Sequence, residues 1–197
     1  LFVLWALDPG FNPHNVMTFE ASPPSSLRHQ SPAAIRAFFR QMHEKLASTP
    51  EIDAVSLVQG AHIMEGDNDD YFWFVGRPKP ARRTEMPMSL IYIVEPDYLK
   101  TLQIALKRGR FLTYADTERA PRVVVIDESL AEKYFPAQNP LGQYLDLNSD
   151  PSERDKSPNP QIVGVVSHVN QWGLDSDASN PLHAQMYLPF AQIPDKY

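Results

Sequence analysis

Four carboxylates lie close together in the segment 65–70, where they could hold a cation or exchange protons with a substrate. They are Glu65, Asp67, Asp69 and Asp70. Carboxylate oxygens suit hard divalent cations, and paired carboxylates can serve as general acid and base. The segment lacks the spacing of a calcium loop, however, and nothing in the sequence places these acids in a pocket. It is therefore predicted to be a solvated turn.

A second acidic segment imitates a calcium loop and fails at two positions. Asp146, Asn148 and Asp150 occupy the ligand positions one, three and five of such a loop. Pro151 stands where the sharp turn needs glycine, and Ser157 stands where a bidentate glutamate belongs. We therefore expect no metal site in this segment.

Motifs for nucleotide binding and for nucleophilic catalysis are missing from the sequence. Neither phosphate-binding pattern, G-x-x-x-x-G-K-[ST] or G-x-G-x-x-G, occurs, and the nucleophile elbow G-x-S-x-G is absent. The six histidines form no H-x-x-x-H pair that would put two metal ligands on one helix face. Each histidine is predicted to be a surface or hydrogen-bonded residue. We expect a chain that is not an enzyme and that needs no cofactor.

A run of four aromatic residues offers contact area instead of chemistry. A strand sends successive side chains to opposite faces, so Tyr71 and Trp73 share one face while Phe72 and Phe74 share the other. The rings either pack in the core or leave one pair partly exposed to a hydrophobic ligand or partner. Trp172, in a long connection near the end of the chain, is the third candidate for that contact surface.

Composition indicates a folded chain built from many short elements. The 197 residues are 43% hydrophobic and 21% charged, which are ordinary values for a globular protein. Nineteen prolines favour mixed α and β structure with stiff turns over a helical bundle. The net charge of −6 argues against a nucleic acid as partner. No stretch approaches the roughly 20 apolar residues of a membrane helix, and the nearest, LFVLWAL at residues 1–7, lacks the features of a signal peptide.

Hydrophobic periodicity predicts helices and strands along the first half of the chain. The segment 31–48 is predicted to be an amphipathic helix with Ser31 as its N-cap. Strands are predicted at 16–21 and 52–58, and such a strand, helix, strand unit allows its two strands to run parallel. The segments 71–75 and 88–94 are predicted to form a hairpin.

The stretch 95–147 carries the densest signals. A short helix after Pro96 is followed by a β-branched run at 122–126 that is typical of a buried strand. Asp127 is predicted to cap a second helix, which Pro136 ends. A turn then leads into a strand at 143–147, and further strands are predicted at 161–166 and 187–188.

Several ordered blocks of sequence together resemble a known family. The blocks are DPGFNPHNVMTFEAS, PDYLKTLQIALKRGRFLTYADT, RVVVIDESLAEKYFP, NPLGQYLDL, QIVGVVSHV and MYLPFAQ. They closely resemble the MacB-type periplasmic core domain, which lies between the first two transmembrane helices of FtsX-like ABC transporter permeases. The resemblance implies a mixed α+β fold with a porter-like subdomain of βαβ units (16–103 plus 176–197). It also implies an inserted small α/β subdomain (104–175) and a juxtamembrane segment (1–15) that continues a membrane helix.

By the same resemblance, the chain is a non-catalytic extracytoplasmic or periplasmic domain of a cell-membrane protein. It would couple ATP-driven transmembrane motion to export of a substrate or to a periplasmic partner. The implied partners are a cytoplasmic ATP-binding subunit or domain and a second permease copy, while the transported substrate stays open. Two alternatives from other classes remain: a free-standing binding protein for an apolar ligand, or a soluble hydrolase with its acids at 65–70.

Overall fold

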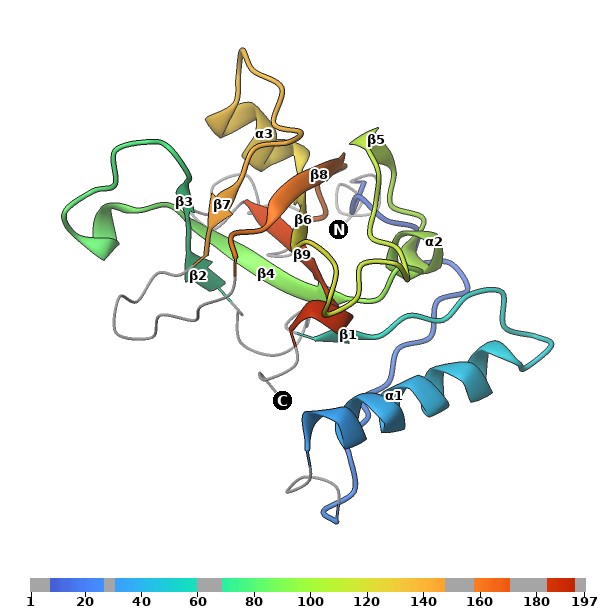
Figure 1. The fold of residues 1–197 in the computed structure, drawn as a ribbon. Coiled ribbons are helices and arrows are strands. Elements are labelled where there is room, and N and C mark those ends of the chain that lie inside the picture. The colour runs from blue at the N-terminus through green and yellow to red at the C-terminus, as the bar shows by residue number, and fades with distance from the viewer. Residues whose placement is uncertain (1–7, 27–30, 60–68, 148–157, 171–183, 194–197) are drawn as a thin grey trace.

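The computed structural model describes residues 8–26, 31–59, 69–147, 158–170 and 184–193. Within these ranges the chain forms a mixed α+β fold around a seven-stranded sheet (Figure 1). The strand order is β1-β4-β9-β6-β8-β5, and β2 also pairs with β4. The sheet strands are β1 (Val58–Gln59), β2 (Asp69–Tyr71), β4 (Met88–Val94), β5 (Leu106–Gly109), β6 (Val123–Asp127), β8 (Gln161–Val166) and β9 (Gln185–Pro189).

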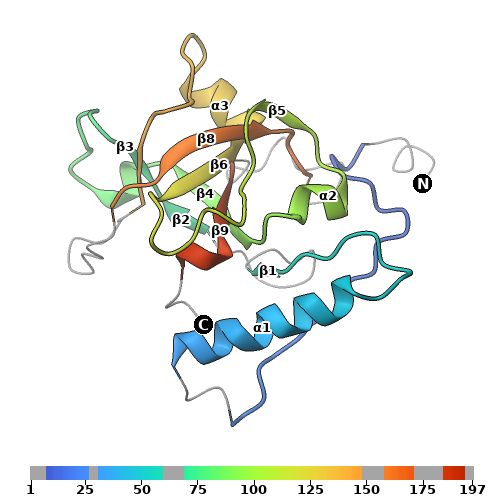
Figure 2. The same ribbon diagram turned by 45° about the vertical axis from the view of Figure 1, so that its right-hand side comes forward.

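The remaining elements lie around this sheet. A small second sheet pairs β3 (Trp73–Phe74) antiparallel to β7 (Leu145–Asp146). The helices are α1 (Pro32–Ala47), α2 (Tyr98–Leu102) and α3 (Glu128–Tyr134), with 3-10 turns η2 (Arg83–Glu85) and η4 (Phe190–Gln192). Figure 2 shows α3 and α2 close to the sheet, whereas α1 lies along its lower end near β1 and η4.

Strand β6 lies in the interior of the sheet and confirms the predicted buried strand. All five of its residues are buried, and it runs parallel to β8 and antiparallel to β9. Its side chains alternate between two apolar clusters, with Val124 and Ile126 facing α3 and Val125 facing the aromatic residues of α2 and β9. A strand covered on both faces needs an uninterrupted apolar run, which the β-branched sequence supplies.

The predicted cap and helix after β6 are also confirmed. The Asp127 carboxylate accepts a hydrogen bond of 2.9 Å from the Leu130 amide, and α3 begins at the next residue. The helix buries Leu130 and Ala131 against β6 and β8 and ends before Pro136. This strand-to-helix turn fixes the Asp127 side chain at the end of β6.

Of the two strands predicted before residue 60, one is wrong and the other is formed only at its end. Residues 16–21 form no strand, and Met17 and Phe19 are largely exposed. Local alternation can suggest a strand, but a strand needs a hydrogen-bonded neighbour, and none of the described strands lies beside this segment. Of the strand predicted at 52–58 only its end is formed, as β1, which runs antiparallel to β4. The predicted parallel strand, helix, strand unit is therefore not formed.

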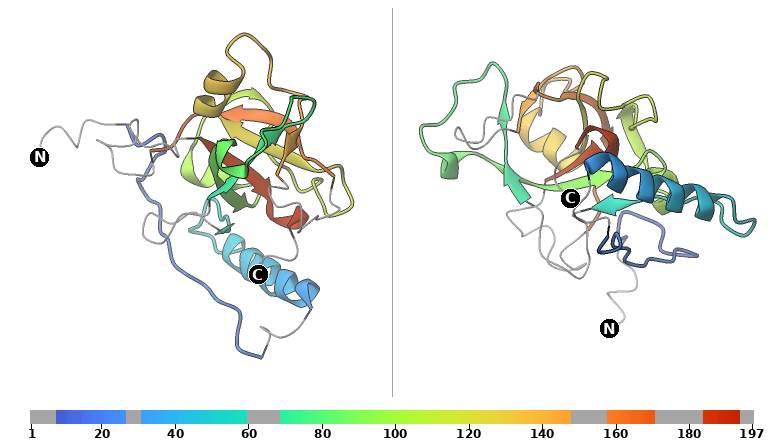
Figure 3. Two further views of the ribbon diagram at one scale, coloured as in Figure 1. Left: turned by 90° about the vertical axis from the view of Figure 1, so that its left-hand side faces the viewer. Right: turned by 60° about the horizontal axis from the view of Figure 1, so that its bottom comes forward.

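The helix predicted at 31–48 is present as α1, although the side chain of Ser31 makes no capping hydrogen bond. The Ser31 carbonyl instead accepts from the Ala34 amide at 2.8 Å. The hydrophobic face of α1 is only partly covered, because Ile35 is buried while Phe39 is half-buried. Figure 3 shows α1 beside the sheet, with the extended segment 8–26 leading into it.

The predicted hairpin is formed in part. Strand β2 pairs antiparallel to β4 through Asp69–Tyr71, but β3 leaves the main sheet and pairs with β7. The strand predicted at 143–147 is correspondingly reduced to β7. Strands from both predicted subdomains join in one sheet, since β9 pairs with β4 on one side and with β6 on the other. The boundary between the porter-like and inserted parts stays a prediction.

Candidate functional site

The described residues contain no group of three or more histidine, aspartate or glutamate side chains that could hold a metal ion. Glu65 and Asp67 of the first acidic segment lie outside the described residues. Asp70 pairs with Arg83 at 2.7 Å. In the second acidic segment, Asp146 pairs with Lys79 at 2.9 Å, and the residues that follow lie outside the described ranges.

A buried polar cluster lies where β6 and β8 end and β9 begins. Parallel strands end at the same edge of a sheet, so Asp127 at the end of β6 is close to His168, which follows β8. Oδ2 of the fully buried Asp127 lies 2.5 Å from Nδ1 of His168. Its Oδ1 accepts from the amides of Leu130 at 2.9 Å and Gln185 at 3.1 Å. We call Asp127, His168, Val169 and Gln185 the polar junction.

The side chain of Gln185 completes the junction from β9. Its Nε2 donates to the Val169 carbonyl at 2.5 Å, and its Oε1 accepts from the hydroxyl of Tyr187 at 3.0 Å. Burial raises the pKa of the Tyr187 phenol well above its usual value, so the hydroxyl keeps its proton and can donate this bond. A buried amide needs hydrogen-bond partners, and here both its nitrogen and its oxygen have at least one.

Asn170, the residue after Val169 of the junction, holds the first described part of the chain, Asp8–Asn12, which we call the N-terminal segment. The Asn170 amide donates to the Pro9 carbonyl at 2.9 Å, and the Asn170 side chain donates to the Asp8 carbonyl at 2.7 Å. Gly10 lies so close that a Cβ atom there would stand 2.1 Å from the His168 carbonyl oxygen. Its φ of +82° is likewise a conformation that glycine adopts easily.

Helix α2 holds the other end of the N-terminal segment. The Asn12 amide donates to the Leu102 carbonyl at 2.9 Å, and the Asn12 side chain donates to Oε1 of Gln103 at 2.9 Å. Phe11 packs against the aromatic cluster that includes Tyr98 and Tyr187. The N-terminal segment is thus fixed both to the end of α2 and to the polar junction.

The junction connects onward to β5. The His168 amide donates to Oε1 of Glu128 at 3.2 Å, and Oε2 of Glu128 lies 3.5 Å from Nζ of Lys107 in β5. A short series of hydrogen bonds and one ion pair therefore links the N-terminal segment to α3 and to the strands β5, β6, β8 and β9. A polar network whose groups satisfy one another holds its elements rigidly relative to one another.

The sequence predicts only parts of this site. It predicts Asp127 as a helix cap and His168 as a surface or hydrogen-bonded histidine, but it indicates neither their pairing nor the role of Gln185. The available signal was a glutamine beside the apolar run MYL, where an amide must find buried partners.

The predicted aromatic contact surface is divided in the structure. Phe72 and Phe74 are buried in the core, as one of the two interpretations requires. Tyr71 is half-buried in β2, with the Arg83 guanidinium 4.8 Å from its ring. Trp73 is half-buried in β3 and donates from Nε1 to the Arg77 carbonyl at 3.2 Å. Trp172 lies outside the described residues, so a shared surface stays a prediction.

No helix among the described residues has both the length and the apolar character needed to cross a membrane. A search of solved structures finds the periplasmic region of MacB from Actinobacillus actinomycetemcomitans, with a TM-score of 0.52 and 20% identity over 80% of this chain and 57% of that chain. This similarity shows the fold.

Sequence relatives point in the same direction. The macrolide export ATP-binding/permease protein MacB of Aggregatibacter actinomycetemcomitans is 29% identical over 54% of this chain. The ABC transporter permease YknZ of Bacillus subtilis is 23% identical over 83% of this chain. The matched residues span only 14% and 39% of the lengths of those two relatives. The model of one family, the MacB-like periplasmic core domain, matches residues 14–197. The chain belongs to the MacB-like periplasmic core domain family.

Proposed function

We propose that this chain is a non-catalytic extracytoplasmic domain of an ABC transporter permease in the cell membrane. It couples ATP-driven movement of transmembrane helices to export of a substrate or to a periplasmic partner. The ATP is bound by a cytoplasmic subunit or domain, and two permease copies move relative to each other. The relatives support this role, because one is named an export ATP-binding/permease protein and another an ABC transporter permease.

The single observation that carries the mechanical part is the attachment of the N-terminal segment. Hydrogen bonds from Asn170 and Asn12 fix its two ends to the junction and to α2. A membrane helix that precedes this segment would therefore act on the sheet through the contacts of Asp8–Asn12. Rigid-body motion of this kind requires defined contacts at the point where force enters the domain.

The experiment uses the complete permease with its ATP-binding partner. This chain contains no cysteine, so Arg119→Cys gives a single exposed labelling position within the domain. Spin labels at this position in two copies report the distance between them with and without ATP. The double variant Asn12→Ala, Asn170→Ala removes the side-chain bonds that hold the N-terminal segment.

The distance is expected to change when ATP binds, and the double variant should reduce that change while ATP hydrolysis continues. Asn139→Ala is the matched control, because its side chain only accepts a bond of 3.2 Å from Leu141 within a distant turn. An unchanged distance on ATP binding in the unmodified permease would contradict the proposal. Turnover of a substrate by the isolated chain, traced to its own side chains, would contradict the non-catalytic role.

A further inference from the structure

Strand β5 forms one end of the main sheet. It pairs antiparallel to β8 on its inner side, and none of the described strands pairs with its outer side. All four of its residues are exposed, including Leu106 at 45%. An exposed edge carries unpaired amide and carbonyl groups, which can add another extended segment.

A β-bulge in β5 turns two cationic side chains toward α3. The register shifts between Leu106 and Arg108, so Lys107 is the extra residue. Lys107 reaches Glu128 at the start of α3, and Arg108 lies opposite Val165, whose side chain belongs to the cluster on the α3 face. Bulges commonly redirect side chains in this way.

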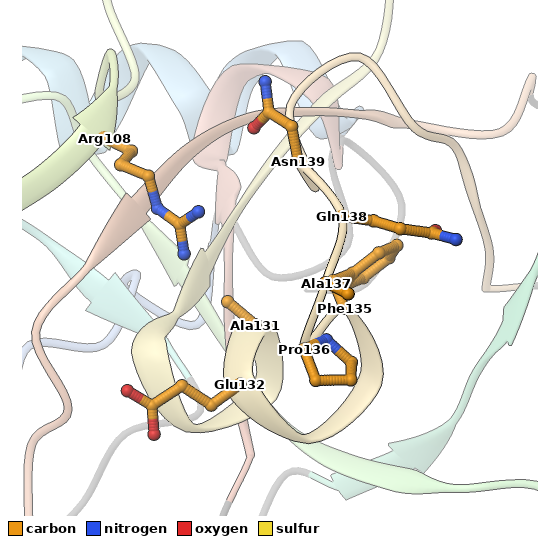
Figure 4. A pocket seen from close by; sticks show the side chains of 8 residues that line it. All are labelled: Arg108, Ala131, Glu132, Phe135, Pro136, Ala137, Gln138 and Asn139. Carbon is orange, nitrogen blue, oxygen red and sulfur yellow. The ribbon is translucent and has the colours of Figure 1, made fainter.

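Arg108 faces a depression of about 470 Å³ between β5 and α3 (Figure 4). The depression is lined by Arg108, Ala131, Glu132, Phe135, Pro136, Ala137, Gln138 and Asn139. Figure 4 shows the Arg108 side chain reaching from β5 toward α3. None of the ion pairs or hydrogen bonds found between described residues uses its guanidinium, although Glu132 also lines the depression.

Charge decides what this edge can accept. A second copy of β5, paired antiparallel, would bring lysine and arginine side chains opposite each other, and like charges in that position destabilise a sheet. An acidic strand places opposite charges there instead. Every second side chain of an added strand would lie on the same face as Arg108, where a carboxylate pairs with the guanidinium. The other side chains would lie on the opposite face with the exposed Leu106, which pairs with Val166 of the second apolar cluster and can contact apolar residues.

We infer that the β5 edge binds an extended segment of a partner protein in which acidic and apolar residues alternate. The backbone of that segment continues the sheet, and Arg108 selects the acidic side chain. This inference goes beyond the proposed function, since it names a binding surface and does not depend on any movement driven by ATP. It can therefore fail while the coupling role stands, and the reverse also holds.

The test uses the 197-residue chain and a short blocked peptide in which glutamate and valine alternate. Binding is measured by fluorescence anisotropy at several salt concentrations, and hydrogen exchange is followed at residues 106–109. We expect the peptide to bind, to protect these amides and to bind less tightly as salt increases. Arg108→Glu should weaken binding at least about tenfold.

Arg40→Glu is the matched control, because it reverses one exposed arginine on α1, at the opposite end of the molecule from β5 (Figure 2). It should leave the affinity unchanged. A peptide with lysine in place of glutamate should not bind, and one with methylated backbone nitrogens should lose affinity because it cannot continue the sheet.

Several outcomes would overturn the inference. These are no binding at about 1 mM peptide, equal losses from Arg108→Glu and Arg40→Glu, or full affinity of the methylated peptide. Protection of residues 106–109 through self-association, seen by analytical ultracentrifugation without peptide, would assign the edge to a second copy instead. If the far-ultraviolet circular dichroism spectrum shows that Arg108→Glu does not fold, Arg108→Gln takes its place in the test. Arg108→Gln should also weaken peptide binding, and full affinity of that variant would overturn the inference.

Discussion

Nδ1 of His168 lies 2.5 Å from Oδ2 of the fully buried Asp127, and this contact joins the end of β6 to the residue that follows β8. A carboxylate oxygen can only accept, so Nδ1 carries the proton of this bond. The other carboxylate oxygen caps α3 and accepts from the first residue of β9. One aspartate therefore holds three strands and a helix in register.

Asp127→Ala should lower the free energy of unfolding by about 3 kcal/mol, because it leaves the buried Leu130 amide and the Gln185 amide without acceptors. Urea denaturation followed by circular dichroism measures the change. Glu132→Ala on the exposed side of α3 should change stability by less than about 0.5 kcal/mol. Equal effects of the two substitutions would show that the junction contributes nothing specific.

Gly10→Ala should detach the N-terminal segment from the sheet. Its Cβ atom would lie 2.1 Å from the His168 carbonyl oxygen, and the backbone at Gly10 has φ +82°. Hydrogen exchange at the Asn170 amide, which donates to the Pro9 carbonyl, should become faster.

Gly76→Ala separates the steric effect of the added Cβ atom from the effect of the positive φ. Gly76 has φ +85°, but an added Cβ would meet nothing within 4 Å. It therefore carries only the conformational cost, about 1 kcal/mol. Unchanged exchange at Asn170 in Gly10→Ala would show that the segment tolerates displacement from the junction.

The ion pair of Asp116 and Arg110 should make stability depend on pH in the acidic range. Burial alone would raise the pKa of the Asp116 carboxyl, but bonds from the Arg110 guanidinium and from Thr113 outweigh it and lower the pKa below its usual value. The folded state thus binds the proton less tightly than the unfolded state does. The resulting stabilisation is present above about pH 4 and is lost as the pH falls through the lowered pKa.

Asp116→Asn should accordingly be less stable than the natural sequence at neutral pH, by about 2 kcal/mol. The difference should shrink as the pH falls below about 4, because the natural carboxyl then also becomes neutral. Thermal unfolding at a series of pH values measures both quantities. A difference that stays constant down to strongly acidic pH would mean that the charge of Asp116 is not the source of the stabilisation.

Phe39→Asp should release α1 and leave the sheet folded. The Phe39 ring meets Phe190 edge-to-face at 6.0 Å, and other links of α1 to the rest are the pairs Arg36–Glu118 at 3.3 Å and His43–Glu95 at 2.6 Å. Hydrogen exchange should become faster within 32–47 and stay slow in β6. Arg40→Asp, on the exposed side of the same helix, should leave exchange unchanged. Simultaneous loss of protection in α1 and β6 would show that the helix is part of one cooperative unit.

The sequence predicts best where the signal is local. The β-branched run before Asp127 and the capping position at Asp127 lie next to each other, so β6 and α3 could both be located from a few residues. Residues 16–21 alternate just as clearly but pair with none of the described strands. The pairing of β4 with β9 joins Leu90 to Gln185, and no local pattern indicates contacts at that separation.

The candidate site follows the same division. The cap at Asp127 was predictable, whereas its contact with Gln185 spans 58 residues and depends on which strand lies beside β6. The requirement for glycine at position 10 could not be predicted from the local sequence. It comes from the nearby His168 carbonyl and not from the turn at Gly10 alone.

Strand β9 comes last among the described strands and yet lies in the interior of the sheet, between β4 and β6. While the chain is being synthesised, its earlier described strands cannot close into a continuous sheet until residues 185–189 have emerged. Two apolar edges stay open to aggregation during that interval. The main sheet is therefore completed only when β9 inserts between β4 and β6. A chaperone that shields nascent strands would prevent the most aggregation just before this step.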